Sequence, residues 1–298
     1  MIRFRKPVLD LTRAMKGELM TQQRILSWNN RVISWLRRLK LRYRLPRRLS
    51  RYLSATSLQS VQRYAESPAS PPRGALFEIW RSIPNGFKWL NYFPIYERIL
   101  SEFRARPIRF LEIGVYHGSS LQMWKKYFHP DSVILGIDID PTCVQFENAD
   151  SNIHVRIGDQ SDTEFLQRVI QEFGPFDVIL DDGSHLCSDM IKTFDYAFLN
   201  GLTDRGVYFV EDTHTNFWGH WRDQPYSFID LCKDLVDYSH AHYWGHSGID
   251  VFASGNPQRL NAISVPRIGS EIEEIRFFDS IIVIHKNKSR ALPVVEHL

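Results

Sequence analysis

Two short clusters of acidic residues, each ending in a histidine, come directly after apolar runs of the chain. DDGSH (181–185) follows VIL at 178–180, and EDTH (211–214) follows VYFV at 207–210. If the two runs are neighbouring strands, Asp182, Glu211 and Asp212 converge, and three adjacent carboxylates repel one another unless a cation neutralises them. An all-oxygen set favours Mg²⁺, with Mn²⁺ or Ca²⁺ as alternatives, over zinc. We therefore predict a metal site at these three acids, with His185 beside it as the proton acceptor.

A structural role is the competing interpretation of the same residues. Asp181 or Ser184 would cap the helix that follows, and His185 would be an ordinary surface residue. Helix capping explains the first cluster but not acids and a histidine after both runs, so the metal site is the favoured hypothesis. His214 is a second candidate for the proton acceptor, although packing against the aromatic residues that follow it is the simpler role.

Carboxylates also follow three earlier apolar runs. In LEIGVYHGSS (111–120), Glu112 precedes Gly114, and a glycine-bearing turn lets the backbone approach a ligand closely. The dinucleotide fingerprint G-x-G-x-x-G is broken there, and a carboxylate suits an ammonium group better than a pyrophosphate. Asp138 follows the second run, where ribose hydroxyls would bind, and Asp159-Gln160 follows the third, near the place of an adenine. Each acid alone could simply cap a loop, but together they favour a cationic ligand that carries a nucleoside.

The elements that would position these residues alternate as in a parallel α/β sheet. The predicted strands are Ile108–Ile113, Val133–Asp138, Ile153–Ile157, Phe176–Leu180 and Gly206–Val210, followed by an antiparallel pair, Ile272–Phe277 and Ser280–His285. The predicted helices lie near 118–127, 141–149, 161–172, 187–198 and 223–239. Such a sheet binds ligands outside the carboxyl ends of its strands, which is where the acidic residues fall.

The first part of the chain differs from the rest in charge. The 298 residues carry a net charge of +3, but residues 1–55 hold 15 Lys and Arg against 2 Asp and Glu, and residues 56–298 hold 22 against 32. Apolar residues at helical spacing from Ile25 to Leu39, among arginines, predict a basic amphipathic helix. We therefore predict a basic helical arm (1–66), a Pro/Ser-rich linker (67–75) and an α/β domain (76–298).

The arm has two interpretations. Its apolar stripe packs on this chain or on a sister subunit in a homo-oligomer, which is the favoured interpretation, or it makes a peripheral contact with a membrane. Nucleic acid is not an expected partner, because the arm has no base-reading module and the body is acidic.

Composition and cysteine usage bear on the compartment. The chain is 43% hydrophobic and 24% charged, which is typical of a globular protein, and no 18 consecutive residues are apolar. Charged residues interrupt the first apolar stretch, so we expect no signal peptide. Cys143, Cys187 and Cys232 are widely spaced, which indicates reduced thiols and a cytoplasmic protein, with membrane-peripheral placement through the arm as the alternative.

Five motifs, from the segment that begins at Lys88-Trp89 to Lys286, carry a resemblance to a known family. They are LEIGVYHGSSLQMW (111–124), GIDIDP (136–141), IGDQSD (157–162), DDGSH (181–185) and VEDTH (210–214). The chain resembles the class I S-adenosylmethionine-dependent methyltransferases, and more narrowly the metal-dependent sugar O-methyltransferases of the mycinamicin and rhamnosyl-tetracenomycin type. The resemblance implies a doubly wound, Rossmann-like, mostly parallel sheet of seven strands, with the basic arm outside it.

The resemblance also implies roles for individual residues. S-adenosylmethionine would be bound by Glu112, Gly114, Tyr116, Gly118, Ser119, Asp138, Asp159, Gln160 and Asp181. Mg²⁺, or Mn²⁺ in its place, would be bound by Asp182, Glu211 and Asp212, and His185 would be the general base. Tyr116 stands where many methyltransferases have a glycine, a departure that this narrower family tolerates.

The implied reaction is methyl transfer to a sugar hydroxyl of a glycosylated natural product, a glycolipid or a glycan. The cation would stabilise the developing alkoxide while His185 takes the proton. The alternatives are a phenolic or polyketide acceptor, a hydroxylase-like relative of the same fold, and a non-catalytic adaptor, against which the intact set of acids argues. The following aromatic residues could equally line an acceptor pocket or fill the core: Trp89, Tyr92, Phe217, Trp218, Trp221, Tyr243 and Trp244.

Overall fold

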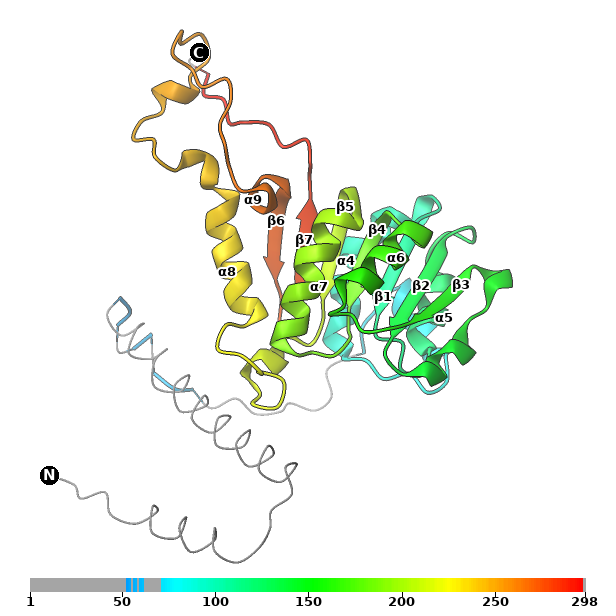
Figure 1. The fold of residues 1–298 in the computed structure, drawn as a ribbon. Coiled ribbons are helices and arrows are strands. Elements are labelled where there is room, and N and C mark those ends of the chain that lie inside the picture. The colour runs from blue at the N-terminus through cyan, green and yellow to red at the C-terminus, as the bar shows by residue number, and fades with distance from the viewer. Residues whose placement is uncertain (1–51, 55, 58, 62–70, 297–298) are drawn as a thin grey trace, which may run out of the picture. The chain divides into compact units, whose positions relative to one another are not determined.

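The computed structural model describes residues 52–54, 56, 57, 59–61 and 71–296 (Figure 1). The predicted amphipathic helix and residues 67–70 of the predicted linker lie outside the described residues, so their roles stay predictions. The chain divides into two units, Met1–Gln62 and Arg63–Leu298. The second unit contains the sheet, its helices and the candidate site.

Within the described residues, seven strands form one sheet in the order β3-β2-β1-β4-β5-β7-β6. The strands are β1 (Arg109–Ile113), β2 (Val133–Asp138), β3 (Ile153–Ile157), β4 (Phe176–Asp181), β5 (Leu202–Val210), β6 (Ile272–Phe277) and β7 (Ile282–Lys286). The first five pair in parallel, and β7 pairs antiparallel with both β5 and β6. The predicted α/β sheet, with its late antiparallel pair, is confirmed.

Helices cover both faces of the sheet (Figure 1). On one face pack α3 (Ala75–Arg81), α4 (Phe93–Leu100) and α5 (Ser119–Tyr127), and on the other α6 (Thr163–Phe173), α7 (Cys187–Asn200) and α8 (Phe228–Ser239); α9 (Arg267–Glu271) precedes β6. Successive strand residues point to opposite faces. Phe110 of β1 therefore packs with Trp124 of α5, whereas Leu111 lies in the core beneath α6 and α7.

Short 3-10 segments connect the helices and strands. They are Leu90–Tyr92, Ser101–Ala105, Pro141–Phe146, Ala149–Ser151, Thr213–Phe217, Ala241–Tyr243 and Asp250–Phe252. Where we predicted one helix at 141–149, two of these segments stand instead. Glu147 at the end of the first is extended and Asn152 after the second is left-handed, so the chain cannot continue as an α-helix.

Among the other boundaries that differ from the sequence prediction, three have a visible local cause. The helix predicted from 223 starts at Phe228, because Ser227 and Asp230 form a capping box there. The fifth strand starts at Leu202, since Leu202 pairs with Phe176 ahead of a register shift. The last strand starts at Ile282 rather than Ser280, whose φ of 71° is incompatible with a strand.

Two remaining expectations concern cysteines and membrane spans. Cys143, Cys187 and Cys232 are buried and make no disulfide. Among the helices of the described residues, none has the length and apolar character needed to cross a bilayer.

Strand register brings the candidate residues to one edge of the sheet. Ile113 of β1 pairs with Asp181 of β4, which in turn pairs with Val210 of β5. The backbone continues this alignment one residue further, because Asp182 N donates to Ile113 O at 2.9 Å and Glu211 N donates to Asp181 O at 2.9 Å. The residues that follow β1, β4 and β5 therefore lie side by side.

Candidate metal and cofactor site

A cleft of about 880 Å³ lies at the carboxyl ends of the parallel strands. Its floor includes Gly114 after β1, Asp138 at the end of β2, Asp159 after β3 and the acids that follow β4 and β5. Phe87–Trp89 and Tyr92, from the segment that leads into α4, form another part of its wall. The cleft is thus continuous from the predicted nucleoside end to the predicted metal end.

Lys88 lies among the clustered acids. Its Nζ donates to Asp182 Oδ2 at 2.6 Å and to Glu211 Oε2 at 2.6 Å, and its side chain is 5% exposed. The two carboxylates converge as predicted, and a positive charge lies between them. Lys88 is not among the predicted site residues, since it is separated from its two partners by 94 and 123 residues.

Two tyrosines hold the other carboxylate oxygens. Tyr92 Oη donates to Asp212 Oδ1 at 2.5 Å and accepts from Ser280 Oγ at 2.9 Å, and Tyr96 Oη donates to Glu211 Oε1. Tyr92 is the N-cap of α4 and Tyr96 lies one helical turn further along, whereas Lys88 lies in the segment that precedes Leu90–Tyr92. The four-residue spacing of the two tyrosines is a sequence signal for one helix face, but it does not include Lys88.

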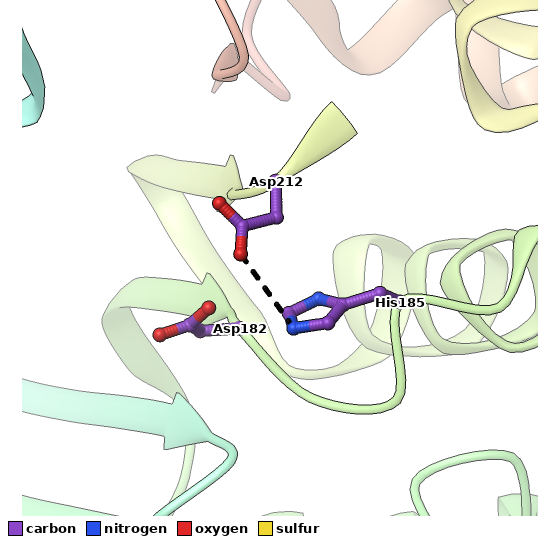
Figure 2. A group of neighbouring side chains, drawn as sticks. All are labelled: Asp182, His185 and Asp212. Atoms are coloured by element: carbon purple, nitrogen blue, oxygen red, sulfur yellow. Dashed lines mark ion pairs between the residues drawn. The ribbon is translucent and has the colours of Figure 1, made fainter. Parts of the chain in front are cut away.

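The side chains of Asp182, His185 and Asp212 lie next to one another (Figure 2). Each of Asp182, His185 and Asp212 offers one possible ligand atom, and these three atoms lie within 4.8 Å of one another. The distance from His185 Nε2 to Asp212 Oδ2 is 3.7 Å. Glu211 is not in this group, and its two oxygens accept from Lys88 and Tyr96. Asp182 and Asp212 therefore meet His185 at one place, and Glu211 is joined to Asp182 through Lys88.

The backbone at two of these residues is strained. His185 has a φ of 57° and Asp212 a φ of 52°, which non-glycine residues seldom adopt. Thr215 Oγ1 donates to both carbonyls, to Asp212 O at 2.7 Å and to His185 O at 3.3 Å. Strain that surrounding bonds maintain is common where side chains must be aimed at a ligand.

The burial of Glu211 beside Asp182 favours a bound cation. Burial raises the pKa of Glu211, and the neighbouring Asp182 raises it further, whereas Lys88 and Tyr96 oppose the shift. A divalent cation would offset the same burial and repulsion. The donor set of carboxylate oxygens fits Mg²⁺ or Mn²⁺, so the residues present suit the predicted metal.

At the nucleoside end, Asp138 organises the glycine turn. Its Oδ2 accepts from Val115 N at 2.8 Å and Tyr116 N at 3.0 Å, and its Oδ1 accepts from Asp140 N at 2.9 Å. Partial burial alone would raise the pKa of Asp138, but the three backbone donors outweigh it and the pKa is lowered. An ionised Asp138 at the cleft can also accept hydrogen bonds from ribose hydroxyls.

Other predicted cofactor residues lie behind the cleft wall. Glu112 is fully buried and accepts from Ser120 Oγ at 2.8 Å and Trp124 Nε1 at 3.1 Å; burial raises its pKa to about 7. Burial likewise raises the pKa of Asp181 to about 7, and Gln160 Nε2 donates to Asp181 Oδ1 at 3.1 Å. These two acids hold the loops that follow β1 and β4.

The structure therefore divides the nine predicted cofactor residues into two groups. Five line the cleft: Gly114, Tyr116, Asp138, Asp159 and Gln160. The other four support it, and they are Glu112, Gly118, Ser119 and Asp181.

His214 has partners of its own. Its Nδ1 is hydrogen bonded to Ser280 Oγ, and its ring packs edge-on against Trp89 and Trp218, with centroid distances of 5.7 and 4.3 Å. Of the seven aromatic candidates for an acceptor pocket, Trp89 and Tyr92 line the cleft.

Gly114 makes the close approach between the loops after β1 and β4. Its φ is 96°, and a Cβ there would lie 2.2 Å from the carbonyl oxygen of Asp182. Gly114→Ala is therefore expected to lower the free energy of unfolding by about 2–4 kcal/mol, the combined cost of a left-handed backbone and an overpacked contact. Thermal denaturation measures the change.

A matched variant separates the two contributions. Gly245 also has a positive φ, of 77°, but a Cβ there meets nothing within 4 Å. Gly245→Ala is expected to lower the free energy of unfolding by about 1 kcal/mol, the cost of the left-handed backbone alone. Equal losses in the two variants would show that the two loops do not touch at Gly114.

Comparisons with known proteins agree with the geometry, although no protein-family model matches the chain. L-olivosyl-oleandolide 3-O-methyltransferase from Streptomyces antibioticus is 35% identical over 211 residues, which are 65% of this chain and 53% of that protein. Mycinamicin VI 2''-O-methyltransferase from Micromonospora griseorubida is 38% identical over 166 residues, 51% of this chain and 40% of that protein. This chain spans about half the length of the curated relatives that it matches.

A solved structure shows the same fold. The MycE methyltransferase of the mycinamycin biosynthetic pathway, in complex with Mg, SAH and mycinamycin VI, is 26% identical with a TM-score of 0.59. The match covers 73% of this chain and 54% of the MycE chain. The resemblance read from the five sequence motifs is thereby confirmed.

Proposed function

We propose that this chain, which is related in sequence and fold to class I S-adenosylmethionine-dependent sugar O-methyltransferases, is itself a metal-dependent O-methyltransferase. The acceptor is a sugar hydroxyl of a glycosylated natural product, a glycolipid or a glycan. The observation that carries the proposal is the meeting of Asp182, Glu211, Asp212 and His185 at one end of a cleft whose other end holds Asp138 and Asp159.

The cofactor would occupy the end of the cleft formed after β1, β2 and β3. Asp138 would accept hydrogen bonds from the ribose hydroxyls, Asp159 and Gln160 would lie near the base, and the backbone of Gly114 and Tyr116 would contact the methionine part; all five residues line the cleft. Glu112, Gly118, Ser119 and Asp181 position these loops from behind.

The metal end would hold Mg²⁺, or Mn²⁺, through Asp182, Glu211 and Asp212. When bound, the cation supplies electrostatic stabilisation for the negative charge that develops on the acceptor hydroxyl. Tyr92 and Tyr96 fix the carboxylates of Asp212 and Glu211 by donating to one oxygen of each, so these side chains are oriented before any ligand arrives.

His185 would act as the general base. As the acceptor oxygen forms a bond to the methyl carbon, the carbon–sulfur bond of S-adenosylmethionine breaks and its electron pair goes to sulfur. The hydroxyl proton passes to His185 Nε2, and the sulfonium becomes a neutral thioether. Trp89, half exposed at the cleft, offers an apolar face on which a sugar ring can stack.

The remaining parts of the proposal concern the whole protein. Residues 1–66 would form the basic arm, 67–75 the linker and 76–298 the methyltransferase domain. We propose that the arm joins copies of a cytoplasmic homo-oligomer, with peripheral membrane contact as the alternative role; its net positive charge suits anionic lipid.

Calorimetry and a methyl-transfer assay test the proposal. S-adenosylmethionine is expected to bind at one saturable site, and labelled methyl is expected to reach deoxysugar glycosides in Mg²⁺ but not in EDTA. Aglycones and catechol serve as the comparison acceptors, and faster transfer to catechol would move the assignment to a phenol. Absence of S-adenosylmethionine binding in both buffers would overturn the methyltransferase assignment.

A further inference from the structure

Lys88 occupies the place where the acidic site needs a positive charge. Its ammonium bridges Asp182 Oδ2 and Glu211 Oε2, each at 2.6 Å. The other oxygen of Glu211 accepts from Tyr96, so both oxygens of this buried carboxylate already have a donor. Glu211 is the most buried of the three proposed metal ligands.

A metal ion and the Lys88 ammonium compete for the same oxygens. For Glu211 to bind a divalent cation, the cation must approach an oxygen that Lys88 or Tyr96 now contacts. Two positive charges a few Å apart in a buried site repel strongly, because little water screens them. The ammonium and the metal therefore do not share Glu211 and Asp182.

We propose that Lys88 is a built-in counter-ion of the acidic site, which it occupies in the metal-free protein and leaves when the divalent cation binds. This inference rests on the metal site of the proposed function. Lys88 lies between Phe87 and Trp89, which are 85% and 50% exposed at the cleft, so a displaced side chain enters the cleft without disturbing the core. Metal binding is thereby coupled to the shape of the cleft that the acceptor enters.

The position of Lys88 also determines what His185 can do. With Lys88 seated, the group of ligand atoms that can meet at a cation consists of Asp182, His185 and Asp212. A metal bound there would use His185 as a ligand and leave Lys88 in place. With Lys88 displaced, the three acids suffice and His185 is free to accept a proton.

Replacing Lys88 tests the competition. Lys88→Met keeps the length of the side chain and removes the charge. Mn²⁺ is expected to bind this variant at least about tenfold more tightly than the wild type, because removing a competing state that is populated at about 90% gives that gain. Calorimetry and electron paramagnetic resonance measure the affinity. Lys126→Met is the matched control, since Lys126 is exposed on α5, and its Mn²⁺ affinity is expected to equal that of the wild type.

A second measurement uses the wild-type protein, in case Lys88→Met does not fold without metal. Reductive methylation of lysine amines, followed by mass spectrometry, is expected to leave Lys88 protected in EDTA and to modify it in Mg²⁺, whereas modification of Lys126 stays constant. If Lys88 stays protected in Mg²⁺ and the paramagnetic resonance spectrum of bound Mn²⁺ shows coupling to a nitrogen, the proposal is overturned. His185 would then be a metal ligand, and the metal site itself would be retained. Failure of both wild type and Lys88→Met to bind Mn²⁺ would overturn the metal site as well.

Discussion

Asp182→Asn is expected to reduce the rate of methyl transfer about a thousandfold at saturating S-adenosylmethionine, a loss of about 4 kcal/mol in transition-state stabilisation. The amide has the shape of the carboxylate and can still accept from Lys88, but it lacks the charge that a divalent cation requires. A Mg²⁺ titration of the labelled-methyl assay measures the change, and part of the loss is expected to be recovered at high Mg²⁺.

Stability separates this effect from misfolding. Asp182 repels buried Glu211 and helps to raise its pKa, so a neutral side chain at 182 relieves repulsion in the metal-free protein. The melting temperature of Asp182→Asn in EDTA is therefore expected to equal or exceed that of the wild type. Asp140→Asn is the control at the cleft rim: asparagine caps as well as aspartate, so the bond to Thr142 N and the activity are retained. Full activity of Asp182→Asn in EDTA would exclude the metal-dependent mechanism.

The architecture was predictable because the central strands are largely apolar runs bounded by turns. Buried parallel strands such as β1 and β4 are apolar on both faces, and this pattern is visible without a partner strand. The failure at 141–149 has a local cause: Pro141 and Asp140 favour a helical start, whereas the extended Glu147 and the left-handed Asn152 divide the segment. The same segment is bonded to β3, because Glu147 Oε2 accepts from Val155 N at 2.9 Å and Asn148 pairs with Ile153.

The candidate site was predictable only in part. The acids of the site follow strands, so topology alone brings Asp182 and Glu211 together. Lys88 reaches them from a segment outside the sheet, and only the packing of α4 against β1 and β5 shows that it fills the space between them. For the same reason Glu112, read as a cofactor ligand at a strand end, is found beneath α5, bonded to Trp124.

His185→Asn is the second variant for which we expect a large effect. Asparagine tolerates the left-handed backbone that His185 adopts, with its φ of 57°, so the loop is retained while the ring is removed. Loss of a general base is expected to lower kcat about 10²–10⁴-fold. S-adenosylmethionine affinity by calorimetry and Mn²⁺ affinity by paramagnetic resonance are expected to match the wild type, because neither ligand needs the imidazole once Lys88 has left Glu211.

Two further variants test whether His185 or His214 is the general base, and whether His185 accepts a proton or binds the metal. His214→Asn removes the rival candidate, whose Nδ1 is bonded to Ser280 and lies 3.9 Å from Asp212 Oδ1, and only a small loss of kcat is expected. His185→Gly also suits a positive φ and leaves space for free imidazole, which is expected to restore part of the turnover. If His185→Asn instead loses Mn²⁺ affinity in proportion to kcat, the imidazole is a metal ligand, Lys88 stays seated, and another group must take the proton from the acceptor.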